Sequence, residues 1–320
     1  MKEFWPNFFI VGARNAGTSS LHVYLRRHPD VFMPGMKEPH FFSRLRPYSQ
    51  LCFPTSHVSD EASYLKLFAK GLGHGAIGEA STSYLWDSLA PSLIHSANPQ
   101  AKIIMLLRDP VERAYSHYLF NVREGYQNLP FYEALLEDWR RPEKVWGLAH
   151  LYVEIGQYRQ QVKRYLDIFG PEQVLVLLSA NMRTLDGRRK MLVDVANFLE
   201  LDAASVAHID LSPTENPFAV PRWNWSRRMA GNMWVRRLAR SLVPPSAGST
   251  WLVKGLIYDR FFLRGAPRPP MDPRAREWLC AIYDDDLSAL EGLLGCRLPE
   301  LRSSWGRASG DCVVQAAGSQ

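Results

Sequence analysis

A short apolar run that stops at a glycine-bearing loop, followed at once by a helical pattern, constrains this chain more than any other feature. Residues 8–11 are continuously apolar, which is typical of a parallel strand buried on both faces. The loop of residues 12–19 comes next, and apolar side chains then recur at helical spacing from Leu21 to Leu25. The sequence therefore predicts a strand, a tight loop and a helix in direct succession.

Strands and helices alternate along the rest of the chain. Three further apolar runs predict buried strands, at 77–79, 102–107 and 174–178. Helical patterns are found over 111–124, 131–139, 156–169, 186–200 and 273–294. No internal repeat is visible, which argues against a solenoid or a propeller. The alternation predicts an α/β fold with a central parallel sheet flanked by helices.

Charge and cysteine content narrow the classes of function. The chain has 320 residues with 38 Lys and Arg against 32 Asp and Glu, a net charge of +6. This balance favours an anionic ligand or partner. The basic residues are scattered and no nucleic-acid-binding motif is present, so nucleic-acid binding is a weak alternative. The 4 cysteines lack metal-ligand spacing, which predicts free thiols and no metal site.

The loop after the first strand has the pattern of a phosphate site. It reads GARNAGTS from Gly12 to Ser19, two glycines separated by four residues and followed by hydroxyl side chains. Backbone N–H groups in such a turn and the start of the next helix can hold a phosphate. A Walker-type nucleoside triphosphatase would carry Lys where Thr18 stands, so a triphosphatase or nucleotide kinase is the weaker interpretation. A strand–helix turn without a ligand is another.

A second candidate anion site follows the strand predicted at 102–107. Arg108 lies at its carboxyl end, the edge at which open parallel sheets bind ligands. Asp109 is predicted to cap a helix that begins at Pro110, and Ser116 falls about two turns into that helix. An arginine at a strand end and a serine on the next helix can grip one phosphate. The alternative is a surface Arg–Asp pair beside a helix cap.

Together the two motifs resemble those of the sulfotransferases that use 3′-phosphoadenosine-5′-phosphosulfate (PAPS). The family's 5′-phosphosulfate loop is similar to FFIVGARNAGTSSL, and its 3′-phosphate motif is similar to LLRDPVERAYSHY. Their separation of about 90 residues is also similar. The resemblance extends over most of residues 5–305 and points to the carbohydrate and heparan-sulfate branch.

The resemblance implies a P-loop, nucleotide-kinase-like fold and a definite reaction. A sulfuryl group moves in line from PAPS to a hydroxyl or amine of a small-molecule, lipid or carbohydrate acceptor, leaving 3′,5′-ADP (PAP), and no metal is required. The residues implied in donor binding are Arg14, Asn15, Ala16, Gly17, Thr18 and Ser19 for the 5′-phosphosulfate, and Arg108 and Ser116 for the 3′-phosphate. Arg264 and Gly265 stand where the family often has a Lys–Gly contact to the nucleotide.

Three side chains are candidates for acid–base work. Glu38 is the leading base, because the resemblance places a carboxylate there. His40 is the alternative base, since histidine titrates near neutral pH. Glu79, near the end of a predicted strand, is either a second acid or base or a group that orients its neighbours, and we favour the orienting role.

The chain departs from the family at Asn15, where a basic residue, most often Lys, is usual. The carbohydrate branch has a further Lys near the position of Ala80. Losing one such donor in a dry site costs about 2.7–4 kcal/mol of transition-state stabilisation. Three alternatives follow: the side chain of Arg14 takes the place of the missing basic residue, another cation takes that place, or the protein binds PAPS with weak or lost catalysis. We favour a substitute cation.

The remaining expectations concern organisation and compartment. We expect one domain over 1–306, with loops and short helices over the acceptor side at 212–271 and a disordered tail at 307–320. No signal peptide and no apolar run of about 18 residues is present, which predicts a cytoplasmic protein without a transmembrane segment. No pattern specifies an oligomeric state.

Overall fold

A mostly parallel sheet forms the centre of the protein in a computed structural model, which describes residues 5–44, 57–147, 149–212, 219–221, 263–265, 267–305 and 314–315. Its strand order is β2-β3-β1-β4-β5-β8, and every neighbouring pair is parallel except β5–β8. The strands are β1 (Phe8–Gly12), β2 (Val31–Phe32), β3 (Ala76–Ala80), β4 (Lys102–Leu107), β5 (Val174–Leu178) and β8 (Val314–Gln315). The predicted α/β fold is confirmed.

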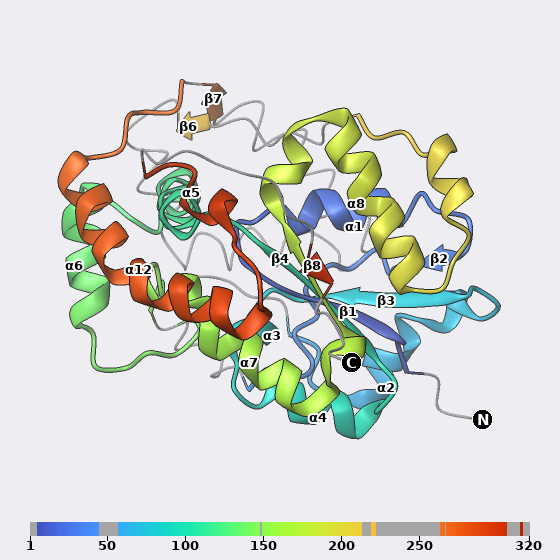
Figure 1. Ribbon diagram of the computed structural model, residues 1–320. Helices are drawn as coiled ribbons and strands as arrows, with labels where there is room; N and C mark the ends of the chain where they lie inside the picture. The colour runs from blue at the N-terminus through green and yellow to red at the C-terminus, as the bar shows by residue number, and fades with distance from the viewer. Residues whose placement is uncertain are drawn as a thin grey trace.

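Helices cover both faces of this sheet. They are α1 (Thr18–Leu25), α2 (Glu61–Lys66), α3 (Ser83–Trp86), α4 (Ala90–Ala97), α5 (Pro110–Arg123), α6 (Phe131–Arg140), α7 (Tyr158–Phe169), α8 (Leu185–Phe198) and α12 (Pro273–Leu294). Figure 1 shows α1 and α8 on one side of the strands and α4 and α7 on the other. The long helix α12 packs on α5, α6 and α7. The layers explain why β1, β3 and β5 are buried at every position.

The longer predicted elements are all present. The short edge strand β2 and the helices α2, α3 and α4 were not predicted. Residues 314–315 form β8, which pairs antiparallel with β5, while 307–313 and 316–320 lie outside the described residues, so the expected disorder of the tail stays a prediction. In the region 212–271, the strands β6 (Ala219–Pro221) and β7 (Leu263–Gly265) form a small antiparallel sheet beside α5, and residues 213–218 and 222–262 lie outside the described residues.

Among the described residues, no helix is long and apolar enough to cross a membrane. The same residues contain no group of three His, Cys, Asp or Glu side chains arranged to hold a metal ion. Cys280 and Cys296 are free thiols, while Cys52 and Cys312 fall outside the described part of the chain.

Candidate active site

The loop at residues 12–19 leads from the carboxyl end of β1 into α1. Gly17 is the N-cap of α1, and none of the described side chains caps this helix end. The first N–H groups of the helix are therefore open to an anion. Thr18 is buried at the first helical position, whereas Ser19 is exposed. Ala16 is buried and closes the turn by donating its N–H to the carbonyl of Ala13 at 3.2 Å.

Gly17 is required by its conformation. Its φ of 102° lies in the left-handed region, and a Cβ atom there would be 3.0 Å from the sulfur of Met182. Met182 belongs to the 3₁₀ helix η5 (Ser179–Arg183), which directly follows β5. The end of β5 thus packs against the loop that follows β1.

Arg108 joins the second predicted anion site to this loop. Its Nη1 donates a hydrogen bond of 2.9 Å to the carbonyl of Asn15. The carbonyl of Arg108 accepts a bond of 2.8 Å from the hydroxyl of Tyr158, which fixes the backbone at the end of β4. The strand-end arginine and the glycine loop therefore share one edge of the sheet, as the sequence predicts for ligand sites.

A cluster of arginines surrounds Glu112 on the first turn of α5. The Glu112 carboxylate lies 2.8 Å from Arg268, 3.8 Å from Arg108 and 4.0 Å from Arg276. Ser116, half-buried, is one turn further along the same face of α5, so it lies beside this cluster. Sequence reasoning missed Arg268, although it stands just after the Arg264–Gly265 pair that was considered instead.

The side chains of β7, including that of Arg264, lie outside the described part of the structure. Only the backbone pairing of β7 with β6 is defined there. The predicted contact of Arg264 and Gly265 with the nucleotide therefore stays a prediction.

Asp109 holds the turn between Arg108 and α5. Its side chain accepts bonds from the N–H groups of Val111 and Glu112, as the cap prediction requires. It also accepts from the N–H of Ser304 at 2.9 Å and from Nε1 of Trp305 at 3.3 Å. Burial raises the pKa of Asp109 while these donors lower it.

Glu38 carries a half-buried carboxylate in the candidate site. Its side chain is 33% exposed, and its Oε1 lies 2.6 Å from Nζ of Lys37 and accepts a bond of 3.1 Å from the hydroxyl of Thr82. Nε2 of His40 is 3.5 Å from Oε2. Burial tends to raise the pKa of Glu38, but Lys37 and His40 outweigh it and hold this pKa well below its usual range. Glu38 is therefore ionised near neutral pH.

The backbone at Glu38 is hydrogen-bonded to the sheet and adopts a φ angle that few residues other than glycine adopt. Its N–H donates to the carbonyl of Ala80 at 2.9 Å, at the end of β3. Asn15, Glu38 and His40 have φ angles of 63°, 60° and 54°. Left-handed conformations cost energy for residues other than glycine and cluster at functional sites.

His40 lies behind Glu38 rather than at the surface. It is 2% exposed, and its Nδ1 is 2.6 Å from the hydroxyl of Ser83 while Nε2 faces Glu38. Its backbone N–H donates to the hydroxyl of Ser81 at 3.0 Å. Because both ring nitrogens have neighbours, this geometry suits a residue that orients Glu38.

Glu79 is fully buried below the site. Its Oε2 accepts bonds from the hydroxyls of Tyr64 at 2.9 Å and Tyr84 at 2.7 Å. Burial raises its pKa to about 7, against the effect of these donors. The structure does not bring Glu79 to the open part of the site, which agrees with an orienting role.

Arg14 turns from the loop toward aromatic rings. Its guanidinium lies 5.1 Å from the ring centre of Trp146 and 5.8 Å from that of Phe120. Trp146 in turn lies 6.2 Å from the ring of His40. The side-chain oxygen of Asn15 is buried and has no hydrogen-bond partner among the described residues.

A buried polar stripe on α5 escaped prediction. Arg113, His117 and Asn121 follow one another at four-residue spacing and are all fully buried. Arg113 and Asn121 bond to the backbone and hydroxyl oxygens of Tyr152, respectively. Burial, with Arg14 and Arg113 nearby, holds the pKa of His117 well below its usual range. The sequence signal that could have identified these residues is a polar side chain at every fourth position of a predicted helix.

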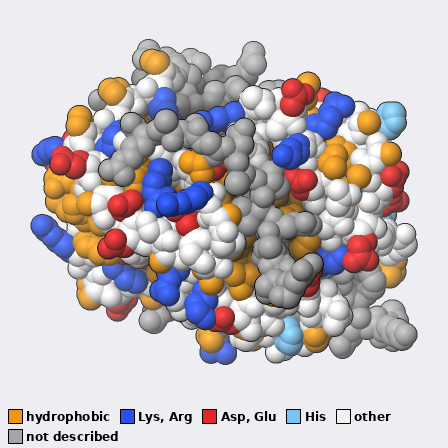
Figure 2. Space-filling model, in the orientation of Figure 1, with side chains coloured by type: hydrophobic (Ala, Val, Ile, Leu, Met, Phe, Trp, Pro, Cys, Tyr) orange, Lys and Arg blue, Asp and Glu red, His pale blue; other side chains and the backbone are white. Residues whose placement is uncertain are grey.

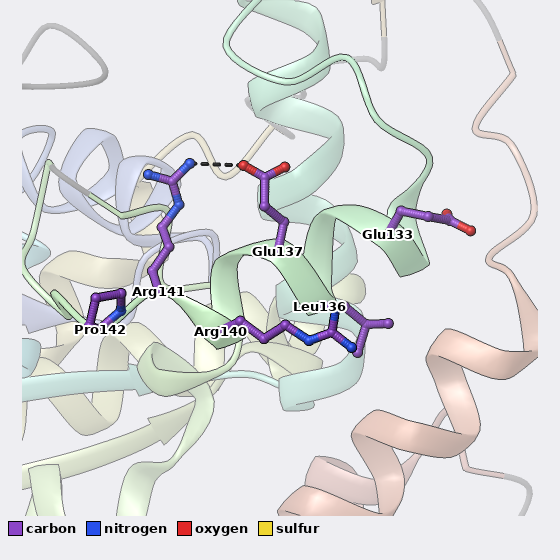
Figure 3. Close-up of a pocket in the computed structure, with 6 residues that line it drawn as sticks. All are labelled: Glu133, Leu136, Glu137, Arg140, Arg141 and Pro142. Carbon is purple, nitrogen blue, oxygen red and sulfur yellow. Dashed lines mark hydrogen bonds and ion pairs between the residues drawn. The ribbon is translucent and has the colours of Figure 1, made fainter.

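Two of the hollows lined by described residues differ in character. A small one is lined by Arg108, Asp109, Ser179, Ala180 and Arg183, among others, at the carboxyl ends of β4 and β5. A larger hollow of about 480 Å³ lies on α6 and the residues after it, and Figure 3 shows that Glu137 and Arg141 pair across its rim. Its lining comes from one continuous segment, Glu133–Pro142, remote in sequence from the loop and from Glu38. The candidate site is the sheet edge, where Arg108 bonds to the loop and the smaller hollow lies.

Charges of both signs are interspersed on the face drawn in Figure 2, with basic side chains gathered in one place beside the grey residues. The described side chains on that face form no continuous basic stripe of the kind that follows a nucleic-acid backbone.

The fold is thus an α/β sheet in which a glycine loop joins a buried parallel strand to a helix, and an arginine that follows the neighbouring strand bonds to that loop. The chain belongs to the sulfotransferase domain family, whose profile matches residues 6–214.

Individual relatives support this assignment. Mouse carbohydrate sulfotransferase 15 is 28% identical over 226 residues, which cover 54% of this chain and 40% of that protein. Human heparan sulfate glucosamine 3-O-sulfotransferase 6 is 33% identical over 165 residues, covering 52% of this chain and 44% of that protein. The chain thus spans less than half the length of these curated relatives. A solved sulfotransferase from Alicyclobacillus acidocaldarius matches with a TM-score of 0.70 and 31% identity, covering 95% of this chain and all of that one.

Proposed function

We propose that the protein transfers a sulfuryl group from PAPS to a hydroxyl or amine of an acceptor. The observation that carries this proposal is the 2.9 Å hydrogen bond from Arg108 to the carbonyl of Asn15, which unites two anion sites at one sheet edge. A nucleotide with phosphates at both ends of one ribose needs two such sites close together.

The residues present fit this donor. The open N-terminus of α1, with the N–H groups of Gly17 and Thr18 and the hydroxyls of Thr18 and Ser19, suits the 5′-phosphosulfate. Arg108 and Ser116 suit the 3′-phosphate, and we add Arg268 because it lies in the same cluster around Glu112.

When bound, PAPS supplies the sulfuryl group, and the chain's own residues do the rest. Glu38 is ionised and partly exposed, so it can take the proton of an acceptor hydroxyl as general base. Thr82 and His40 keep the carboxylate in one orientation. Glu79 fixes Tyr64 and Tyr84 beneath the segment that carries Glu38.

The names of the relatives support a proposal for the acceptor class. Their names describe carbohydrate and glucosamine acceptors, so we propose a carbohydrate hydroxyl or amine first and other hydroxyl compounds second. A protein that binds PAPS with weak or lost catalysis is the competing function, and the neutral Asn15 side chain in the loop favours it.

Calorimetric titration with PAP and with ADP tests the donor proposal. We expect PAP to bind at least about tenfold more tightly, since a charge-assisted grip on the 3′-phosphate contributes about 1.5–3 kcal/mol. Equal or weaker binding of PAP would overturn it. Incubation with PAPS and a panel of saccharides, phenols and amines then separates the two functions, because binding without any sulfated product supports the non-catalytic one.

A further inference from the structure

The site as described has few cations where a phosphosulfate would meet the loop. The only basic side chain within residues 12–19 is that of Arg14, and it lies over the rings of Phe120 and Trp146. The carboxylate of Glu38 adds a negative charge of its own. A negatively charged donor next to this carboxylate needs a positive charge between them, because like charges at short range repel.

Among the basic side chains of the described residues, that of Lys37 contacts this carboxylate directly. Its Nζ lies 2.6 Å from Oε1 of Glu38, and its side chain is 21% exposed. The backbone bond from Glu38 to Ala80 and the bond from Thr82 to the carboxylate hold this pair at the end of β3. β3 is the direct neighbour of β1, the strand that ends in the loop.

The ammonium of Lys37 is also within electrostatic range of α1. After burial itself, Lys37 is the largest influence that lowers the pKa of His22, which falls to about 3. His22 stands one turn beyond Thr18 on the same face of α1. The charge of Lys37 therefore acts both on the proposed base and on the helix that begins at the candidate phosphate loop.

We propose that Lys37 is a donor-binding residue that changes partner: it pairs with Glu38 in the free protein and turns to the 5′-phosphosulfate when the nucleotide is present. A flexible four-carbon side chain with three donors suits such an exchange. The exchange supplies the charge that the loop lacks and at the same time frees Glu38 to act as a base. This inference rests on the proposed use of PAPS.

Two ligands that differ only at the 5′ end isolate this role. Titration of the full chain carrying Lys37→Met with PAP and with adenosine 3′-monophosphate compares a ligand that has the 5′-phosphate with one that lacks it. We expect PAP to bind about tenfold more weakly than to the parent protein, and the 3′-monophosphate to bind within about twofold. A matched control is Lys163→Met, which removes another short Lys–carboxylate pair, with Asp167 on the exposed side of α7, and should change neither affinity.

The outcomes separate the two proposals. If the parent protein binds PAP but Lys37→Met binds it equally well, or loses both ligands alike, the role of Lys37 is refuted and the PAPS proposal stands. If the parent protein binds neither ligand, the PAPS proposal itself fails.

A second variant distinguishes missing charge from lost structure. Adding Asn15→Lys to Lys37→Met places a cation at another backbone position of the same site, and we expect it to restore part of the PAP affinity. A double variant that is folded by circular dichroism but recovers nothing would show that the loss was not one of charge, and would overturn the inference.

Discussion

The guanidinium of Arg108 bonds to the carbonyl of Asn15 although 93 residues separate the two in the chain. Arg108 directly follows β4 and Asn15 lies in the loop after β1, and these two strands are neighbours in the sheet. The side chain that we assign to the 3′-phosphate therefore also fixes the backbone of the loop that we assign to the 5′-phosphosulfate.

Replacing Arg108 tests this double role. Arg108→Met should weaken adenosine 3′-monophosphate by about tenfold or more, because this ligand carries the 3′-phosphate, and should weaken PAP further, because the loop assigned to its 5′-phosphate loses the bond from Arg108. Calorimetry measures this, with Arg140→Met on the exposed side of α6 as a control that should leave both affinities unchanged. Undiminished binding by the Arg108 variant would rule out its assignment.

Replacing Glu38 tests the base. Glu38→Gln keeps the shape of the side chain but removes its proton affinity, so the rate of transfer to an acceptor should fall by about 10²–10⁴-fold. The affinity for PAP should not fall, since a negative charge near the donor is lost. Initial velocities with an active acceptor measure this rate. The control variant Thr82→Val removes only one hydrogen bond to Glu38 and should lower the rate far less. A variant with near-parental rates would exclude Glu38 as the base.

Glu79 should make folding stability depend on pH. Its folded pKa, about 7, is raised above its ordinary value of 4.5. The stabilisation from its protonated form is therefore complete below pH 4.5 and is lost as the pH rises through 7, a change of about 3 kcal/mol at most. Urea unfolding at pH 5 and pH 8 should show a smaller decline for Glu79→Gln than for the parent. Identical declines would contradict the burial of an ionisable carboxyl there.

Gly17 should be intolerant of a side chain for reasons of backbone conformation. Gly17→Ala places a Cβ atom at a φ of 102°, which costs about 1–2 kcal/mol of unfolding free energy, and it approaches Met182 as well. Adding Met182→Ala makes room without changing φ, so the double variant should remain destabilised and should bind PAP poorly. Full recovery of stability in the double variant would mean that contact with Met182, rather than conformation, sets the requirement.

The parts of the site that the sequence predicts are those encoded in continuous stretches. Phe8 to Ser19 contains both the strand and the loop, and Arg108 follows directly on its own strand, so local patterns suffice to place both at the same sheet edge. The lengths of the main helices follow from caps such as Asp109 and Asp272, which the structure shows accepting backbone bonds.

The parts that escaped depend on contacts between distant segments. Glu79 is fully buried because Tyr64 and Tyr84 converge on it from different helices, and no pattern around residue 79 indicates that. Arg268 reaches Glu112 from a segment whose path along the surface has no sequence signature. The left-handed conformations of Glu38 and His40 were not predicted either, because a positive φ is uncommon for residues other than glycine, even for histidine, which is enriched there.

The contact of Asp109 with Ser304 and Trp305 has a practical consequence. Cutting the chain before Ser304 would leave a buried carboxylate without two of its donors, next to the arginine that we assign to the nucleotide. Trimming this end for crystallisation, or attaching a bulky tag close to it, would thus disturb ligand affinity from nearly two hundred positions away.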